Sequence, residues 1–212
     1  MGEMAQRTEE QLDRLATMIP GARVHRIEAR FGGKRPEILP GGIDLGEQDP
    51  GAHRRTLPPL SAAWEGRKVN LEFSPAPAPE TWWMNLYVSG TSPVPLTLTA
   101  LHTTGFTRSG PVAQQSFRTG DEAFDALYDA ASSTPETALR ILEDPENRQR
   151  IMAMGEIERL TLDRKFIRLM RLVDEFSDIE AEGLKRTISE MALLATHLEA
   201  SASSAVGQAP PS

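Results

Sequence analysis

The sequence predicts an α+β fold, with an antiparallel meander followed by two short helices, a β-hairpin and a long C-terminal helix. Apolar and polar residues alternate in several segments between residues 60 and 99, which is the pattern of half-buried strands. Helix starts marked by proline then follow at Thr134-Pro135 and Asp144-Pro145. Most of the 16 prolines and 16 glycines precede residue 121, so loops are concentrated in the first half of the chain.

The first predicted element is an amphipathic helix from about Thr8 to Met18. Thr8-Glu9-Glu10-Gln11 has the spacing of a capping box, and Pro20-Gly21 ends the helix. One helical face is apolar: Leu12, Leu15 and Ile19. This face must rest either on the domain or on a partner.

Residues 21–58 are predicted to form a loop-rich linker, because three clusters of glycine and proline fall within about twenty residues. The chain is therefore expected to divide into an N-terminal helix over 1–20, this linker, a single α+β domain over 59–200 and a tail over 201–212. The tail is rich in alanine and serine and is expected to be disordered.

The meander is predicted from four alternating segments. Leu60–Trp64 and Val69–Phe73 form a tight hairpin over Glu65-Gly66. Residues 82–88 and 96–99 continue the alternation. Four antiparallel strands with one packed face are expected.

The second half begins with residues 127–131, which fit either a strand or a short helix. Two short helices follow from residues 135 and 145. Residues 157–162 and 166–171 then form a hairpin, with Arg168 and Arg171 expected on its solvated face. The longest helix follows the capping box at 177–180 and runs to Leu198.

A Gly-Asp box, consisting of Gly120, Asp121, Phe124 and Asp125, separates the two halves. Glycine permits a positive φ angle, and aspartate accepts hydrogen bonds from the amides that follow it. Phe124 is expected to pack in the core. We therefore interpret the box as a structural turn.

Between residues 60 and 198 the order of elements resembles an uncharacterised family of bacterial proteins. The residues that carry the resemblance are Glu65–Val69, the Gly-Asp box with Thr119, the two proline-marked helix starts, the late hairpin and the closing helix. The chain departs from the family at Leu127-Tyr128-Asp129, where the family has a more apolar strand. The resemblance implies an α+β fold and supplies no mechanism.

The composition of the chain argues against several classes of function. A net charge of −7 argues against binding of nucleic acid, and the absence of cysteine excludes disulfides and thiolate ligands. No segment approaches the length of a membrane span, and the start of the chain has no apolar leader. We expect a soluble cytoplasmic protein without a metal or a cofactor.

Two groups are candidates for catalysis. His102 is followed by Thr103 and Thr104, and Asp121 with Asp125 could act as a pair of carboxylates. The four histidines show no metal-binding spacing, and no phosphate-binding glycine loop is present. Catalysis is therefore the less favoured interpretation.

The favoured interpretation is a non-catalytic interaction or regulatory module that binds another protein. Adjacent residues on a strand point to opposite faces, so one of Trp82 and Trp83 is expected in the core and the other on the surface. The long helix offers a second surface, with Leu184, Ile188 and Met191 on one face, and this stripe also suits self-association.

Two alternatives remain open. One is a module that binds a small ligand or lipid in a cavity between sheet and helices, lined by adaptable methionines: Met152, Met154, Met170 and Met191. The other is an enzyme that uses His102 or the Asp121/Asp125 pair.

Overall fold

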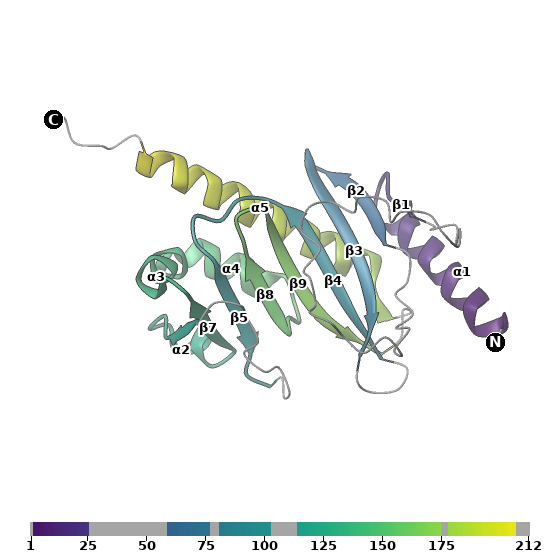
Figure 1. The fold of residues 1–212 in the computed structure, drawn as a ribbon, viewed down its shortest axis with the longest axis horizontal. Coiled ribbons are helices and arrows are strands. Elements are labelled where there is room, and N and C mark those ends of the chain that lie inside the picture. The colour runs from purple at the N-terminus through teal and green to yellow at the C-terminus, as the bar shows by residue number, and fades with distance from the viewer. Residues whose placement is uncertain (1, 26–58, 77–80, 103–113, 175–177, 207–212) are drawn as a thin grey trace, which may run out of the picture.

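The computed structural model describes residues 2–25, 59–76, 81–102, 114–174 and 178–206. It has a mixed α+β fold, as predicted, in which the long helices pack on one face of an antiparallel sheet (Figure 1). From residue 26 on, the predicted linker lies outside the described residues.

The sheet has nine strands in the order β1-β2-β3-β4-β9-β8-β5-β7-β6, and every neighbouring pair is antiparallel. The strands are β1 (Arg23–Val24), β2 (Leu60–Trp64), β3 (Arg67–Pro75), β4 (Trp82–Ser89), β5 (Leu96–Ala100), β6 (Gln115–Phe117), β7 (Tyr128–Ser132), β8 (Arg159–Leu162) and β9 (Phe166–Val173). Residues 127–131, which the sequence left open, therefore belong largely to a strand.

The described helices are α1 (Gly2–Met18), α2 (Glu122–Asp125), α3 (Pro135–Glu143), α4 (Pro145–Ala153) and α5 (Ala181–Val206). Proline occupies the first turn of both α3 and α4, as predicted. Asp144 caps α4 by accepting a bond from the Glu146 amide, whereas Thr134 precedes α3 without a side-chain bond.

The order of strands differs from a simple four-stranded meander. β2, β3 and β4 follow one another as predicted, but the β8–β9 hairpin lies between β4 and β5. β9 is apolar on both faces, since Ile167 and Leu169 are buried on one side and Met170 on the other. A strand with this pattern is stable at the centre of a sheet, so it separates the two halves.

The core lies between the sheet and α5. Buried side chains of neighbouring strands meet in register, such as Leu86 with Leu169 and Leu98 with Leu160. The predicted stripe of α5 closes this core: Leu184, Ile188 and Met191. These three side chains are buried inside the chain and are not open to a partner in this conformation.

The N-terminal helix packs on the same core. Leu12, Leu15 and Ile19 are almost fully buried, and α1 contacts both β1 and α5. The apolar face of α1 therefore rests on the domain and not on a partner.

At the C-terminal end, α5 continues to Val206, beyond residue 201 where the tail was expected to begin. Alanine and serine do not interrupt a helix that is already formed.

Candidate interaction surface

The face of the sheet opposite α5, which we call the outer face, carries the candidate site. Its central positions belong to β3, β4, β9 and β8: Glu72, Trp83, Asn85, Tyr87, Arg159, Thr161, Arg168, Met170 and Leu172. The buried apolar residues of the described helices belong to the core on the other face. Within the described part of the chain, this face is left without a helical layer.

The two tryptophans point to opposite faces, as the alternation predicted. Trp82 is partly buried against the core. Trp83 lies on the outer face, opposite Leu172 of β9, and is itself partly buried. Leu172 is 38% exposed, which makes it one of the most exposed large apolar side chains among the described residues. Trp83 and Leu172 together form an apolar patch at one end of the outer face.

A polar network lies beside this patch. The Arg168 guanidinium donates to Oδ1 of Asn85 from Nη2 at 2.7 Å and from Nε at 3.2 Å. Its Cζ atom lies 5.5 Å from the centre of the Tyr87 ring, which is the geometry of a cation–π contact. Tyr87 in turn meets the edge of Phe166, with ring centres 5.7 Å apart. The network fixes Arg168 in one position.

The charges of this network are partly removed from water. Burial raises the pKa of Glu72, and the nearby Arg168 guanidinium partly offsets the rise. Burial also raises the pKa of Tyr87, with Arg168 acting in the opposite sense. The pKa of Arg159 is lowered by burial and by repulsion from Arg168. Charged groups at the centre of the outer face are therefore held in an environment drier than an ordinary sheet surface.

The prediction that Arg168 and Arg171 share one solvated face is wrong. Residues three apart on a strand point to opposite faces. Arg168 pairs with Thr161 on the outer face, whereas Arg171 lies on the helical side and contacts Glu156 at 3.4 Å. The odd spacing of the two arginines was the signal that could have separated them.

The Gly-Asp box is a turn held by hydrogen bonds from backbone amides to its two carboxylates. Asp121 accepts from the Phe124 amide at 3.1 Å, and its second oxygen contacts Arg148 at 3.0 Å. Asp125 accepts from the amides of Thr119 and Gly120 at 3.0 and 3.1 Å. Gly120 has a φ angle of 83°. Both carboxylates thus hold the backbone of their own loop, and Phe124 is fully buried as predicted.

His102 lies at the exposed end of β5. Its Nε2 atom is 3.4 Å from Oε1 of Glu158, and its side chain is 69% exposed. Thr103 and Thr104 lie outside the described residues. The described geometry therefore brings no nucleophile to His102.

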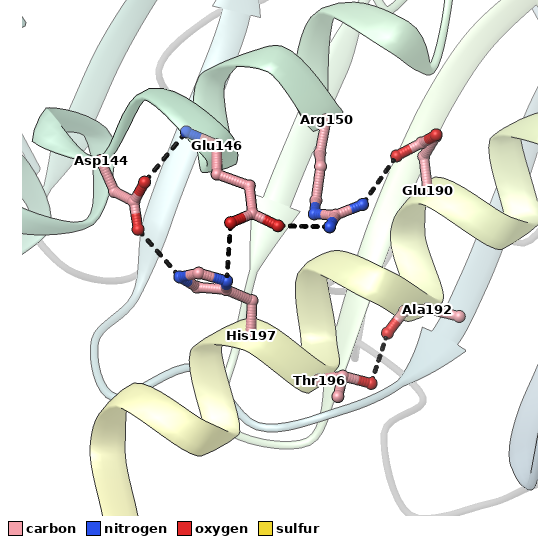
Figure 2. Close-up of polar contacts among 7 residues, drawn as sticks. All are labelled: Asp144, Glu146, Arg150, Glu190, Ala192, Thr196 and His197. Atoms are coloured by element: carbon pink, nitrogen blue, oxygen red, sulfur yellow. Dashed lines mark hydrogen bonds and ion pairs between the residues drawn. The ribbon is translucent and has the colours of Figure 1, made fainter. Parts of the chain in front are cut away.

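A second polar cluster joins α4 to α5 (Figure 2). His197 of α5 has Nε2 at 2.8 Å from Asp144 and Nδ1 at 3.6 Å from Glu146. Arg150 contacts Glu146 and, at 3.3 Å, Glu190. Figure 2 shows the side chains of Asp144, Glu146 and Arg150 pointing toward His197 and Glu190 of α5. We interpret the cluster as a set of polar contacts that hold α4 and α5 together.

Two shallow hollows lie on the surface of the described residues, one of about 630 Å³ beside the cluster of His197 and Arg150 and one of about 370 Å³ beside the end of β9. The lining of both is largely polar or charged. Neither is lined by the four methionines on which a ligand cavity was expected to depend, of which Met154 and Met191 are core and Met152 is exposed. Among the described residues, no group of histidine and carboxylate side chains could hold a metal ion.

Comparisons with known proteins assign no family to the chain. No family model and no curated protein matches the chain. A solved structure that is similar to it is the mycobacterial trehalose monomycolate transport factor A, with a TM-score of 0.46 and 15% identity, over 67% of this chain and 73% of that one. Within the described residues, no helix has the length and apolar character needed to cross a bilayer.

Proposed function

We propose that this protein is a non-catalytic interaction module that binds another protein through the outer face of its sheet. The observation that carries the proposal is the apolar patch of Trp83 and Leu172, which lies in register on a face that no described helix covers. Exposed apolar patches of this kind are typical of surfaces that bind other proteins.

The composition of the outer face supports the proposal. Energetically dominant residues in protein interfaces are enriched in Trp, Tyr and Arg. Tyr87 and Arg168 are register partners on β4 and β9, and Trp83 lies on the same face four residues along β4 from Tyr87. Asn85, which is only 5% exposed, holds Arg168 in place. A surface that is already ordered loses less conformational entropy when it binds.

The proposal can be tested by photo-crosslinking in the cells that naturally contain the protein. A benzophenone amino acid replaces Leu172 on the outer face, and in a second variant it replaces Leu193 on α5, which is similarly exposed at 40%. We expect a discrete crosslinked product from position 172 and none from position 193. Trp83→Ala, added to the first variant, should abolish the product.

The opposite results would contradict the proposal. A product from position 193 alone would move the interaction to the helical side. A product from position 172 that survives Trp83→Ala would remove Trp83 from the interface. Circular dichroism of Trp83→Ala confirms that a lost product is not a lost fold.

A further inference from the structure

One row of the outer face has an acid on β3 and a base on β8, with β4 and β9 between them. Glu72 of β3 pairs with Asn85 of β4, which pairs with Met170 of β9. Met170 pairs in turn with Arg159 of β8. Neighbouring strands lie about 4.8 Å apart, so the backbones at Glu72 and Arg159 are about 14 Å apart within one chain.

A second row has the opposite arrangement, with a base on β3 and an acid just after β8. The Lys68 amide donates to Oγ of Ser89 at 2.9 Å, and Ser89 pairs with Phe166 of β9. The Phe166 carbonyl accepts a bond from the Asp163 amide at 2.9 Å. The Phe166 ring meets Tyr87 on the outer face, so the side chains of this row point to that face. From the second row to the first, β3 changes from base to acid and the β8 side changes from acid to base.

Resting on the proposed function, we infer that the partner of the outer face is a second copy of this chain. The two sheets pack face to face about a two-fold axis that runs along the strands between β4 and β9. Such an axis keeps each row and exchanges the strands, so β3 of one copy faces β8 of the other and β4 faces β9.

This axis brings opposite charges together in both rows. Glu72 of each copy faces Arg159 of the other copy, and Lys68 faces Asp163 in the same way. Packed sheets lie about 10 Å apart, a distance that two such side chains span from opposite sides. Each contact occurs twice, because the two-fold axis repeats it.

The same axis doubles the apolar patch. Trp83 of β4 and Leu172 of β9 are register partners on either side of the axis, so Trp83 of each copy faces Leu172 of the other. Four apolar side chains then meet at the axis, where a single copy has two. The outer face is therefore complementary to itself both in its apolar patch and in the order of its charges.

The size of this contact predicts a weak dimer. The four strands β3, β4, β9 and β8 measure about 19 Å across, and the eight residues of β4 extend about 26 Å. Two faces of these dimensions bury on the order of 1,000 Å², which is the lower end for a specific interface. The fraction of dimer should therefore depend on protein concentration.

Sedimentation velocity of the full chain at increasing concentration tests the inference, and we expect a reversible monomer–dimer equilibrium. Lys68→Glu should weaken the dimer by roughly 10-fold, because two attractive contacts with Asp163 become repulsive. Asp163→Lys should weaken it similarly. An equimolar mixture of the two variants should regain the wild-type affinity, because an acid again faces a base in each of these contacts.

Arg186→Glu is the matched control. It changes the charge of the chain by the same amount as Lys68→Glu, at an exposed position of α5, and should leave the dimer unchanged. Trp83→Ala should weaken the dimer by removing the contact with Leu172. Recovery of affinity in the mixture shows that neither charge variant has lost its fold.

Three outcomes would overturn the inference. A chain that stays monomeric, with a crosslinked product from position 172 whose mass is not twice that of the chain, would leave the proposed function in place with a different partner. A dimer that persists in Lys68→Glu, Asp163→Lys and Trp83→Ala would assign self-association to another surface. Charge variants that weaken the dimer but regain nothing when mixed would show that β3 does not face β8. A monomer that gives no product from position 172 would contradict the proposed function itself.

Discussion

Asp125 shows how a single side chain organises a turn. Burial raises the pKa of its carboxyl, but bonds from the amide and hydroxyl of Thr119 and from the amide of Gly120 outweigh this effect and hold the pKa below its ordinary value. The sequence identified Asp125 as a turn residue because its spacing from Gly120 is local. It could not indicate the contact of Asp121 with Arg148, which depends on how α4 packs.

Asp125→Asn should destabilise the fold by about 1–2 kcal/mol, because an amide NH₂ cannot accept the bond that one carboxylate oxygen accepts. Glu122→Gln, at the first residue of α2, is the control for loss of charge. The folded-state pKa of Asp125 is lowered, so its contribution is full above the ordinary aspartate value of about 3.8 and is lost as the pH falls through the folded pKa. Urea unfolding at pH 7 and pH 3 should show a smaller difference between wild type and Asp125→Asn at pH 3. An equal difference at both pH values would contradict this account.

The close packing of α5 against the end of β4 requires a glycine at residue 90. A Cβ atom on Gly90, at the end of β4, would lie 2.6 Å from the Cβ of Ala195 on α5. The helix can approach the sheet this closely only because neither residue is larger. Nearby, Arg67 donates to both oxygens of Glu199 at 3.2 and 2.8 Å and so fixes the C-terminal half of α5 beside the same corner.

Gly90→Ala should therefore cost about 1–3 kcal/mol of stability, because the helix must shift to relieve the clash. Gly183→Ala, within α5, is the control. There the new Cβ meets nothing closer than 3.9 Å, so the free energy of unfolding should rise by up to about 1 kcal/mol. Thermal unfolding measures both. A stability of Gly90→Ala equal to that of the wild type would mean that α5 does not pack so closely.

Local elements were predictable and their long-range pairing was not. The hairpin turn at Glu65-Gly66 and the proline starts of α3 and α4 follow from residues within a few positions of each other. The pairing of Trp82 with Val173 joins residues about ninety positions apart, and nothing near either residue specifies it. The apolar character of both faces of β9 was the available sign that it is a central strand.

At the scale of the whole molecule, the N-terminal helix belongs to the same cooperative unit as the sheet. Leu15 is 1% exposed and lies in the core shared by α1, the sheet and α5. Leu15→Ala should lower the free energy of unfolding by about 2–5 kcal/mol in a single transition. Asp13→Ala, at an exposed position of the same helix, should change it far less. A separate early transition in Leu15→Ala, with the main transition unchanged, would show that α1 folds independently.

The place of β9 in the sheet has a consequence for synthesis on the ribosome. β4 ends at Ser89, but the strand that pairs with its free edge begins only at Phe166. Until that strand leaves the exit tunnel, the edge of β4 that pairs with β9 is unpaired, and the apolar face of β2, β3 and β4 is not yet covered by α5. A nascent chain from which β4 has emerged but β9 has not therefore exposes the edge of β4 and is the form most in need of a chaperone.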